Sequence, residues 1–328
     1  MRSLRTALSL CLLAFSLAPL QALAWGETGH SLIASTGASL TSQGQDFFQA
    51  NVANFGHLTT IPDVLWKSTN AKEEGPNHWF QADYYFPSCS ASDIATFPKS
   101  YAQAVTQYGQ SVVTAQGTGP WRVRQLYAMA VKSLQSGDVN SAMQYMGTMS
   151  HYIGDMSQPL HDSENYDGGM TSSNGKGTGV HYFFESENIS KANQSSMQTA
   201  VMTQAQALLN DSDFTSQFSG DLSDVLYNEV ARALSHRDEL LGNDSSYGRK
   251  GQGVSIQLAL AEARMADGAA TLALILDHLY TDAAVTQSYG QVSVSDPSWV
   301  TNDFSDSSAW LEPYCPIHPQ TDDDCSRN

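Results

Sequence analysis

The sequence contains few basic residues. Lysine and arginine together number 16 in a chain of 328 residues, against 33 aspartate and glutamate residues, so the formal net charge is −17 at pH 7. A chain this acidic lacks the basic stripe with which a protein follows a long polyanion. We therefore expect no stable nucleic-acid partner, and any phosphate that the protein handles needs a source of positive charge other than lysine.

Cysteine is also scarce, with four residues in the whole chain. One of them, Cys11, lies in the N-terminal segment that we expect to be removed, and the remaining three cannot all pair within one chain. The pair closest in sequence, Cys315 and Cys325, is the natural disulfide in an oxidising compartment and would leave Cys89 free. Pairing of Cys89 with one of the two C-terminal cysteines is the alternative.

Long apolar runs are absent beyond the N-terminus. Residues 1–24, MRSLRTALSLCLLAFSLAPLQALA, combine two arginines, an apolar run over residues 7–17 and the small-x-small ending ALA. This pattern predicts a secretory signal peptide cleaved between Ala24 and Trp25, and hence an extracellular or periplasmic protein. No later segment reaches the roughly 18 consecutive apolar residues that a span requires, so we expect no transmembrane segment in the mature chain.

Apolar residues in the rest of the chain recur at helical intervals, which predicts an all-α fold with a single multi-helix domain over residues 25–281. A loop rich in Gly, Ser and Asn is expected at residues 162–179, and an irregular acidic tail with the Cys315–Cys325 bridge at residues 282–328. The predicted helices include residues 98–115, 121–135, 140–156, 195–209, 222–241 and 254–280.

The segment HYIGDMSQPLH, residues 151–161, contains three potential metal ligands, separated by four and by six residues. His151 and Asp155 are four residues apart and would project from the same face of a helix. Pro159 would end that helix, so His161 would approach from a different direction. Three ligands that converge from two directions indicate a metal site.

A second pair at the same spacing, His181 and Glu185 in HYFFE, follows the predicted loop. With His161 it provides two imidazoles and a carboxylate, a set that suits zinc with one position left open. Taken singly, such residues are more often hydrogen-bonded structural residues, but their co-occurrence in one helical chain favours a common site. Three further candidates lie upstream, namely His30 in WGETGH, Asp63 in IPDVLW and His78 in NHWFQADYY.

The order of these residues resembles that of a known superfamily. A tryptophan at the mature N-terminus is followed by His, Asp, His, HxxxD, His and HxxxE, as in the tri-zinc phosphoesterases that include bacterial zinc-dependent phospholipases C and fungal and plant single-strand-specific nucleases. The resemblance carries its ligands over residues 25–185. It implies an all-α fold of the zinc phospholipase C and single-strand nuclease type, and three Zn²⁺ ions as cofactors.

The resemblance also assigns nine positions to the three zinc ions. Asp155 would bridge two metals, Trp25 would contribute its free α-amino group and carbonyl oxygen, and Asp63 would have a catalytic role in orienting or deprotonating the attacking water. The three dications would supply the positive charge that the acidic chain lacks. The implied sets are Asp63, His78, His151 and Asp155 for one zinc, His161, His181 and Glu185 for the second, and Trp25, His30 and Asp155 for the third.

The two branches of the superfamily differ in substrate. Glu185 and its surroundings, GVHYFFESEN, resemble the phospholipases, since the nucleases carry Asp there, whereas the short interval in WGETGH resembles the nucleases. The residues that cage choline in phospholipases have no counterpart at matching positions. Glu27, Trp66 and Trp79 offer a different cage, although aromatic residues beside metal sites usually serve packing.

The leading interpretation is a secreted, monomeric zinc phospholipase C. It would act transiently at membrane surfaces and hydrolyse glycerophospholipids to diacylglycerol and a phosphorylated head group. A tri-zinc single-strand nuclease or nucleotidase is the alternative. A metal-stabilised binding protein without turnover is a third hypothesis, and zinc content without hydrolysis would identify it.

Overall fold

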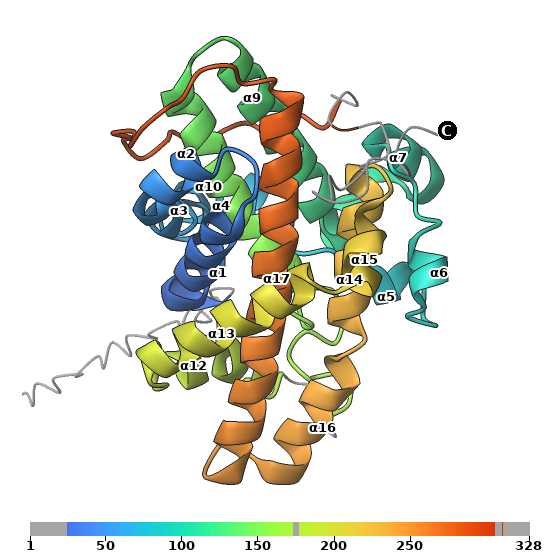
Figure 1. The fold of residues 1–328 in the computed structure, drawn as a ribbon. Helices are drawn as coiled ribbons and strands as arrows, with labels where there is room; N and C mark the ends of the chain where they lie inside the picture. The colour runs from blue at the N-terminus through green and yellow to red at the C-terminus, as the bar shows by residue number, and fades with distance from the viewer. Residues whose placement is uncertain (1–24, 173–176, 306–309, 311–328) are drawn as a thin grey trace, which may run out of the picture.

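The computed structural model describes residues 25–172, 177–305 and 310. The predicted all-α fold is confirmed, because these residues form helices and no strand (Figure 1). The predicted signal peptide and the predicted Cys315–Cys325 bridge lie outside the described residues. The N-terminal elements are α1 (Gly26–Leu40), α2 (Gln45–Ala50), α3 (Val52–Leu58), the π-helix η1 (Pro62–Trp66), α4 (Lys67–Glu74), the 3-10 helix η2 (Gly75–His78), α5 (Ala82–Tyr85), α6 (Ala91–Ile94), α7 (Tyr101–Tyr108) and α8 (Gln110–Gln116).

The remaining elements include the longest helices of the fold. No helix among the described residues is long and apolar enough to cross a membrane. These elements are α9 (Gly119–Gln135), α10 (Val139–Met156), α11 (Val180–Tyr182), the π-helix η3 (Phe183–Glu187), α12 (Asn188–Ser190), α13 (Gln194–Leu209), α14 (Ser212–Thr215), the 3-10 helix η4 (Ser216–Phe218), α15 (Leu222–Leu234), α16 (Arg237–Tyr247) and α17 (Gln252–Asp282).

Helix α10 lies at the centre of the fold, packed against α9, α3, α1 and α17 (Figure 1). Asp138 is the N-cap of this helix, and its side chain accepts a hydrogen bond from the backbone N–H of Ser141 at 3.1 Å. Two glycines permit the close packing: a Cβ on Gly147 would lie 2.4 Å from the Cβ of Leu58, and one on Gly154 would lie 3.1 Å from Nδ1 of His30. The small residues of α10 therefore let α3 and α1 approach it.

Two predicted helices are wrong in their extent. The segment 98–115 divides into α7 and α8 at Gly109, whose φ of 85° is a conformation that glycine adopts without strain. The segment 222–241 divides into α15 and α16 after Leu234, and the chain turns so that Arg237 forms an ion pair with Asp83 at 2.7 Å. Helical periodicity continues across both breaks, so it could not reveal them.

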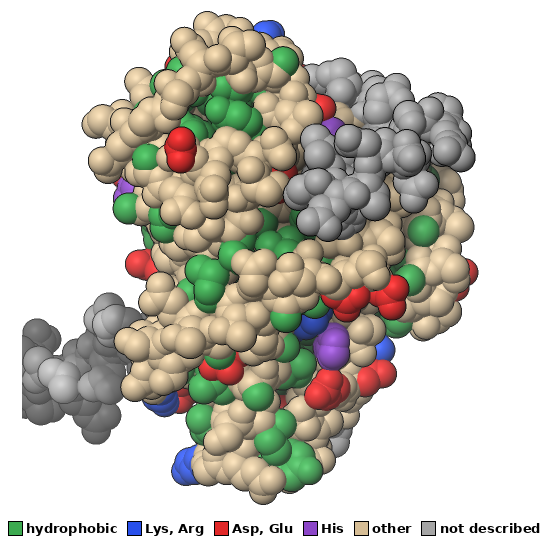
Figure 2. Space-filling view, viewed as in Figure 1, with side chains coloured by type: hydrophobic (Ala, Val, Ile, Leu, Met, Phe, Trp, Pro, Cys, Tyr) green, Lys and Arg blue, Asp and Glu red, His purple; other side chains and the backbone are tan. Residues whose placement is uncertain are grey.

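Residues 283–305, which we call the C-terminal strap, contain no helix and pack across the N-terminal helices (Figure 1). The indole of Trp66 donates to the carbonyl of Pro297 at 3.0 Å, and the Asn302 amide donates to the carbonyl of Glu73 at 2.9 Å. The strap therefore crosses the segment that connects η1 to η2. On the face shown in Figure 2, Lys and Arg side chains are isolated, whereas Asp and Glu side chains gather over α15 and α16.

Candidate metal centre

Helix α10 presents His151 and Asp155 side by side, as the spacing predicts. Both side chains are fully buried, and His151 Nε2 lies 3.3 Å from Asp155 Oδ2. The other ring nitrogen, Nδ1, lies 2.7 Å from the carbonyl oxygen of Thr59. Because a carbonyl only accepts, Nδ1 carries the proton and Nε2 keeps its lone pair. The fold thus selects the tautomer in which the inward-facing nitrogen of His151 can bind a cation.

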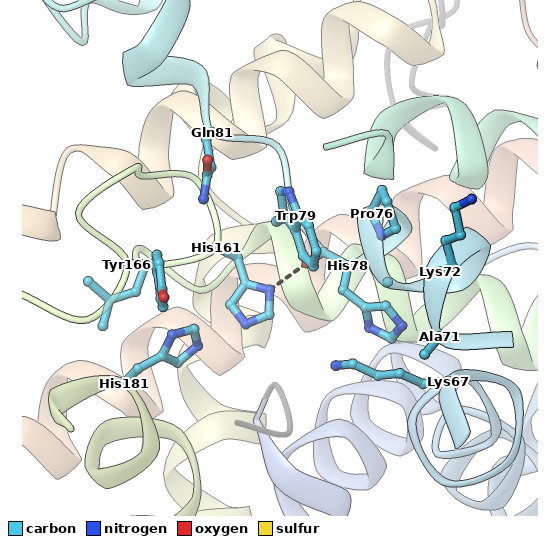
Figure 3. A pocket seen from close by; sticks show the side chains of 12 residues that line it. Lys67, Ala71, Lys72, Pro76, His78, Trp79, Gln81, His161, Tyr166 and His181 are labelled. Atoms are coloured by element: carbon cyan, nitrogen blue, oxygen red, sulfur yellow. Dashed lines mark hydrogen bonds between the residues drawn. The ribbon is translucent and has the colours of Figure 1, made fainter. Parts of the chain in front are cut away.

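The turn after α10 delivers His161 from another direction. Helix α10 ends at Met156, and His161 Nδ1 lies 2.5 Å from the carbonyl oxygen of His78 (Figure 3). The same reasoning places the proton on Nδ1 and leaves Nε2 free, at 3.5 Å from Glu185 Oε2. His161 is therefore oriented by the backbone of another candidate ligand.

His181 and Glu185 come from the short helix α11 and the π-helix η3. His181 Nε2 lies 2.8 Å from Glu185 Oε2, and the amide of Gln158 donates to the same oxygen at 2.8 Å. Glu185 is fully buried and His161 nearly so. The three predicted ligands of one zinc, His161, His181 and Glu185, therefore lie together.

Asp63, His78 and His30 reach the same region from η1, η2 and α1. His78 Nδ1 lies 3.1 Å from Asp155 Oδ2 and 3.6 Å from Asp63 Oδ1, and His30 Nε2 lies 3.4 Å from Asp155 Oδ1. Asp155 thus contacts imidazoles from both sides, in the central place that a bridging ligand needs. Trp25 is buried beside them, and its indole donates to the carbonyl of Gly154 at 2.7 Å.

Eight of the nine predicted residues form three groups whose nitrogen or oxygen atoms lie within 4.8 Å of one another. The groups differ from the implied sets in two ways: His151 takes part in two groups, and Asp155, the expected bridge, takes part only in the group that contains His30 and His151. Trp25 joins them through the packing of its side chain. The groups are His30, His151 and Asp155; Asp63, His78 and His151; and His161, His181 and Glu185.

The donor atoms of this region fit a bound metal. Among the described residues, buried polar atoms without a hydrogen-bond partner include both ring nitrogens of His30, Nε2 of His161, Oδ1 of Asp155 and Oε1 of Glu185. Buried polar atoms are rarely left unpaired, because their desolvation is costly. The separations between facing donor atoms, 2.8–4.0 Å, lie around the roughly 3.3 Å edge of a tetrahedral zinc site. The residues present therefore suit zinc.

The protonation of the carboxylates agrees with this assignment. Burial alone would raise the pKa of Asp155, but the surrounding imidazoles, first His151, lower it well below its usual range. The pKa values of Asp63 and Glu185 are likewise lowered, against burial, by neighbouring cationic groups. Burial and the nearby His151 lower the pKa of His30. These four groups are therefore in their ligand forms at neutral pH.

His78 and His161 behave differently. Burial and Lys67 act to lower the pKa of His78, but hydrogen bonding and charge from Asp155, Glu74 and Asp63 raise it to about 9. Burial likewise acts to lower the pKa of His161, but Asp155 and Glu185 raise it. A metal that bound His78 would therefore release a proton at neutral pH.

Glu74, a fully buried carboxylate whose Oε1 lies 3.4 Å from His78 Nε2, was not predicted from the sequence. Its spacing from His78 is four residues, as in the two predicted pairs. Three other residues were not predicted: the carbonyl of Thr59 faces His151, the amide of Gln158 donates to Glu185, and the indole of Trp299 donates to Glu74. No local pattern marks these three.

A cavity of about 550 Å³ opens beside the groups, and His78, His161 and His181 line it (Figure 3). Lys67 and Lys72 line one side, and no acidic residue is among the described lining. Lys67 Nζ lies 3.3 Å from Asp63 Oδ1. The cavity therefore suits an anionic group. Trp79 and Tyr166 add aromatic surface to it.

The alternative choline cage finds little support. Trp66 is 1% exposed and lies beneath the guanidinium of Arg122, so it serves packing. Glu27 is exposed in the first turn of α1 and does not line the cavity. Of the three residues considered, the cavity contains only Trp79.

Comparison with known proteins gives matches of several kinds. A family model described as S1/P1 nuclease matches residues 25–281. A probable serine protease of Bradyrhizobium tropiciagri is 25% identical over 239 residues, which cover 49% of this chain and 30% of that protein, so the chain spans less than a third of that relative.

Two solved structures also match the chain. The alpha toxin from Clostridium absonum has a TM-score of 0.45 and 13% identity, covering 80% of this chain and 67% of the toxin. The Clostridium perfringens alpha-toxin has a TM-score of 0.41 and 16% identity, covering 80% of this chain and 65% of the toxin. The family match contains all nine candidate ligands and ends before the C-terminal strap.

Proposed function

This chain belongs to the S1/P1 nuclease family, and from that premise we propose that it is a secreted zinc-dependent phosphodiester hydrolase that acts on glycerophospholipids as a phospholipase C. One observation carries the hydrolase assignment. Three groups of buried histidines and carboxylates, with unpaired donor atoms, adjoin a cavity that contains two lysines and no described acidic residue.

Zinc held by these residues would supply Lewis acidity at a phosphoryl group and make a nearby water acidic. Asp63 is a buried carboxylate in contact with Lys67 and His78, which line the cavity, and it could accept a proton from that water or orient it. Lys67 holds Asp63 by an ion pair and faces the cavity, where its ammonium can attract the substrate phosphate (Figure 3). Buried His151 and His161 are held by backbone carbonyls, which preorganises the site.

The choice of a lipid substrate is supported by exposed apolar side chains near the candidate ligands. Large exposed hydrophobic residues usually occur singly, whereas contiguous ones mark interaction or membrane sites. Here Tyr166 lines the cavity, Val64 follows Asp63 and Tyr182 follows His181. The large exposed hydrophobic residues among the described ones are Val64, Leu65, Tyr84, Tyr166, Met170, Tyr182 and Tyr247. Among these residues, Tyr247 alone is remote in sequence from every candidate ligand and every residue that lines the cavity.

A single-strand nuclease or nucleotidase is the second candidate. The family description favours it, as do Trp79 and Tyr166, because aromatic rings beside a phosphate site can stack on bases. Against it, a longer strand would bring further phosphates toward a strongly acidic protein.

Parallel assays of the purified chain on phosphatidylcholine vesicles and on single-stranded DNA test the proposal. We expect faster lipid hydrolysis at matched phosphodiester concentration, loss of activity with a chelator and its return with added zinc. Asp63→Asn is the matched inactive variant, since it keeps the shape of the side chain without its charge. Rapid DNA cleavage with intact vesicles would replace the phospholipase assignment by the nuclease, and zinc binding without either activity would favour the binding protein.

A further inference from the structure

We propose that the C-terminal strap is part of the metal centre: Trp299, acting through Glu74, holds His78 in the orientation in which it binds zinc. This inference rests on the proposed function for the presence of zinc, but goes beyond the family resemblance. The strap lies after residue 281, where the family match ends. Trp299 is a positioning residue, since it touches no candidate ligand directly.

The first step is the relation between Glu74 and His78. Glu74 Oε1 lies 3.4 Å from His78 Nε2, while His78 Nδ1 faces Asp155 at 3.1 Å and His151 Nε2 at 2.9 Å. The 3.4 Å contact is an ion-pair separation without a hydrogen bond, and a carboxylate that faces one ring nitrogen favours the proton there and leaves the other nitrogen as the ligand. Glu74 therefore directs Nδ1 of His78 toward the metal groups.

The second step is the cage of donors that holds Glu74. Its Oε2 accepts hydrogen bonds from the indole of Trp299 and the amide of Asn77, each at 3.0 Å, and lies 3.4 Å from the guanidinium of Arg122. The hydroxyl of Tyr152 donates to Oε1. These four contacts hold the buried carboxylate of Glu74 in a fixed orientation.

The third step is the anchoring of the strap directly after Trp299. Arg122 donates to the carbonyl of Val300 at 2.8 Å, and Gln125 donates to the carbonyl of Thr301 at 2.8 Å. The amide of Asn77 bonds to Asn302 Oδ1 at 2.9 Å. Arg122 and Asn77 therefore bind both Glu74 and the strap, so the position of the strap and that of the carboxylate are coupled.

The test compares three full-length variants for zinc binding, measured by competition with a chromophoric chelator. Trp299→Phe keeps an aromatic ring but removes the indole N–H, and Glu74→Gln removes the charge that faces His78. Asp296→Asn is the control, because it breaks an exposed contact of the strap with His57, at 2.6 Å, away from Glu74.

We expect Glu74→Gln to weaken one zinc by about 10–100-fold, the range for residues that orient a metal ligand, and Trp299→Phe to weaken the same zinc by up to about tenfold. The other zinc ions and the Asp296→Asn variant should keep wild-type affinity. In the cobalt-substituted protein, the ligand-field absorption of one ion should change in Trp299→Phe and Glu74→Gln. A merely structural role would leave that signature unchanged.

Glu74→Gln leaves the buried Arg122 without its anion, so this variant can fail to fold; Trp299→Phe then decides alone. Wild-type zinc affinity and cobalt absorption in Trp299→Phe would overturn the inference while leaving the proposed function intact. Equal weakening of all zinc ions in Trp299→Phe would also overturn it, since that indicates general destabilisation. A wild-type chain that binds no zinc would overturn the proposed function and this inference together.

Discussion

Two buried polar clusters in this protein compensate the charge of their buried carboxylates in different ways. Between α15 and α17, Glu229 and Asp267 contact Arg232, and Arg264 contacts Asp267 at 3.2 Å. In the candidate metal centre, Asp155 faces histidines and Glu185 has an oxygen with no partner. In the first cluster, two arginines and a proton on Glu229, whose pKa burial and Asp267 raise to about 8, balance the carboxylates, whereas histidines surround the carboxylates of the second. Buried charge that the chain itself neutralises indicates architecture; unpaired converging donors indicate a ligand.

The largest effect should come from Asp155→Asn, which removes charge from the residue that contacts His30, His78 and His151. We expect at least a 100-fold loss of hydrolysis, above the 10–100-fold typical of residues outside the coordination shell. His30→Ala should cost less, because His30 belongs to one group and Asp155 lies between two. Activity and zinc content measured together check this, and equal losses in the two variants would contradict the bridging role.

Arg232→Met should break the arginine cluster between α15 and α17 without disturbing the metal centre. It would leave Glu229 and Asp267 buried without their shared arginine, and removal of one partner from a buried ion pair typically costs about 3–5 kcal/mol. Chemical denaturation should detect this loss of unfolding free energy. Zinc content should stay at the wild-type value under native conditions. Loss of zinc from the folded variant would show that the clusters are coupled.

Metal removal should destabilise the metal centre and leave the arginine cluster intact. Zinc binding to the folded chain adds to its stability, so a chelator should lower the melting temperature and abolish hydrolysis. Because no arginine neutralises Asp155 or Glu185, the metal-free centre should be the weakest part of the fold. Hydrogen exchange should then rise around α10 and η3 and stay low around α15. Uniform exchange in both regions would contradict the comparison.

A smaller effect should appear in the pH dependence of the free energy of unfolding. Burial and the charge of Asp267 raise the pKa of Glu229 from 4.5 to about 8, so the folded chain binds this proton more tightly than the unfolded chain. The associated stability is present below about pH 4.5 and is lost as pH rises toward 8, with a slope of at most about 1.4 kcal/mol per pH unit. Glu229→Gln should flatten this part of the stability profile of the metal-free protein, and an unchanged profile would contradict the shift.

The smallest effect should come from an exposed side chain that is next in sequence to a candidate ligand. Tyr182 and Tyr247 are both 49% exposed, but only Tyr182 adjoins a candidate ligand. Tyr182→Ser should reduce hydrolysis of phosphatidylcholine vesicles about fivefold, the equivalent of roughly 1 kcal/mol of apolar burial at the lipid surface. Tyr247→Ser is the control and should have no effect. Equal activity of both variants would remove the support for lipid docking there.

Local geometry explains how much could be predicted. The pairs His151 with Asp155 and His181 with Glu185 were recognisable because residues four apart share a helix face, whatever the rest of the fold. The division of 222–241 after Leu234 was not recognisable, since it depends on the ion pair of Arg237 with Asp83. Cleavage before Trp25, the Cys315–Cys325 bridge and the substrate stay predictions.

The sequence by itself determined the helical class, the acidic charge and the residue types of the candidate centre, because periodicity, composition and i,i+4 spacing are properties of short segments. Only the tertiary structure decided that His151 takes part in two groups and that Glu74 faces His78 under a strap residue 225 positions away. Such contacts depend on how side chains of distant segments pack, as when Gly154 admits His30 against α10. No spacing along the chain encodes that packing.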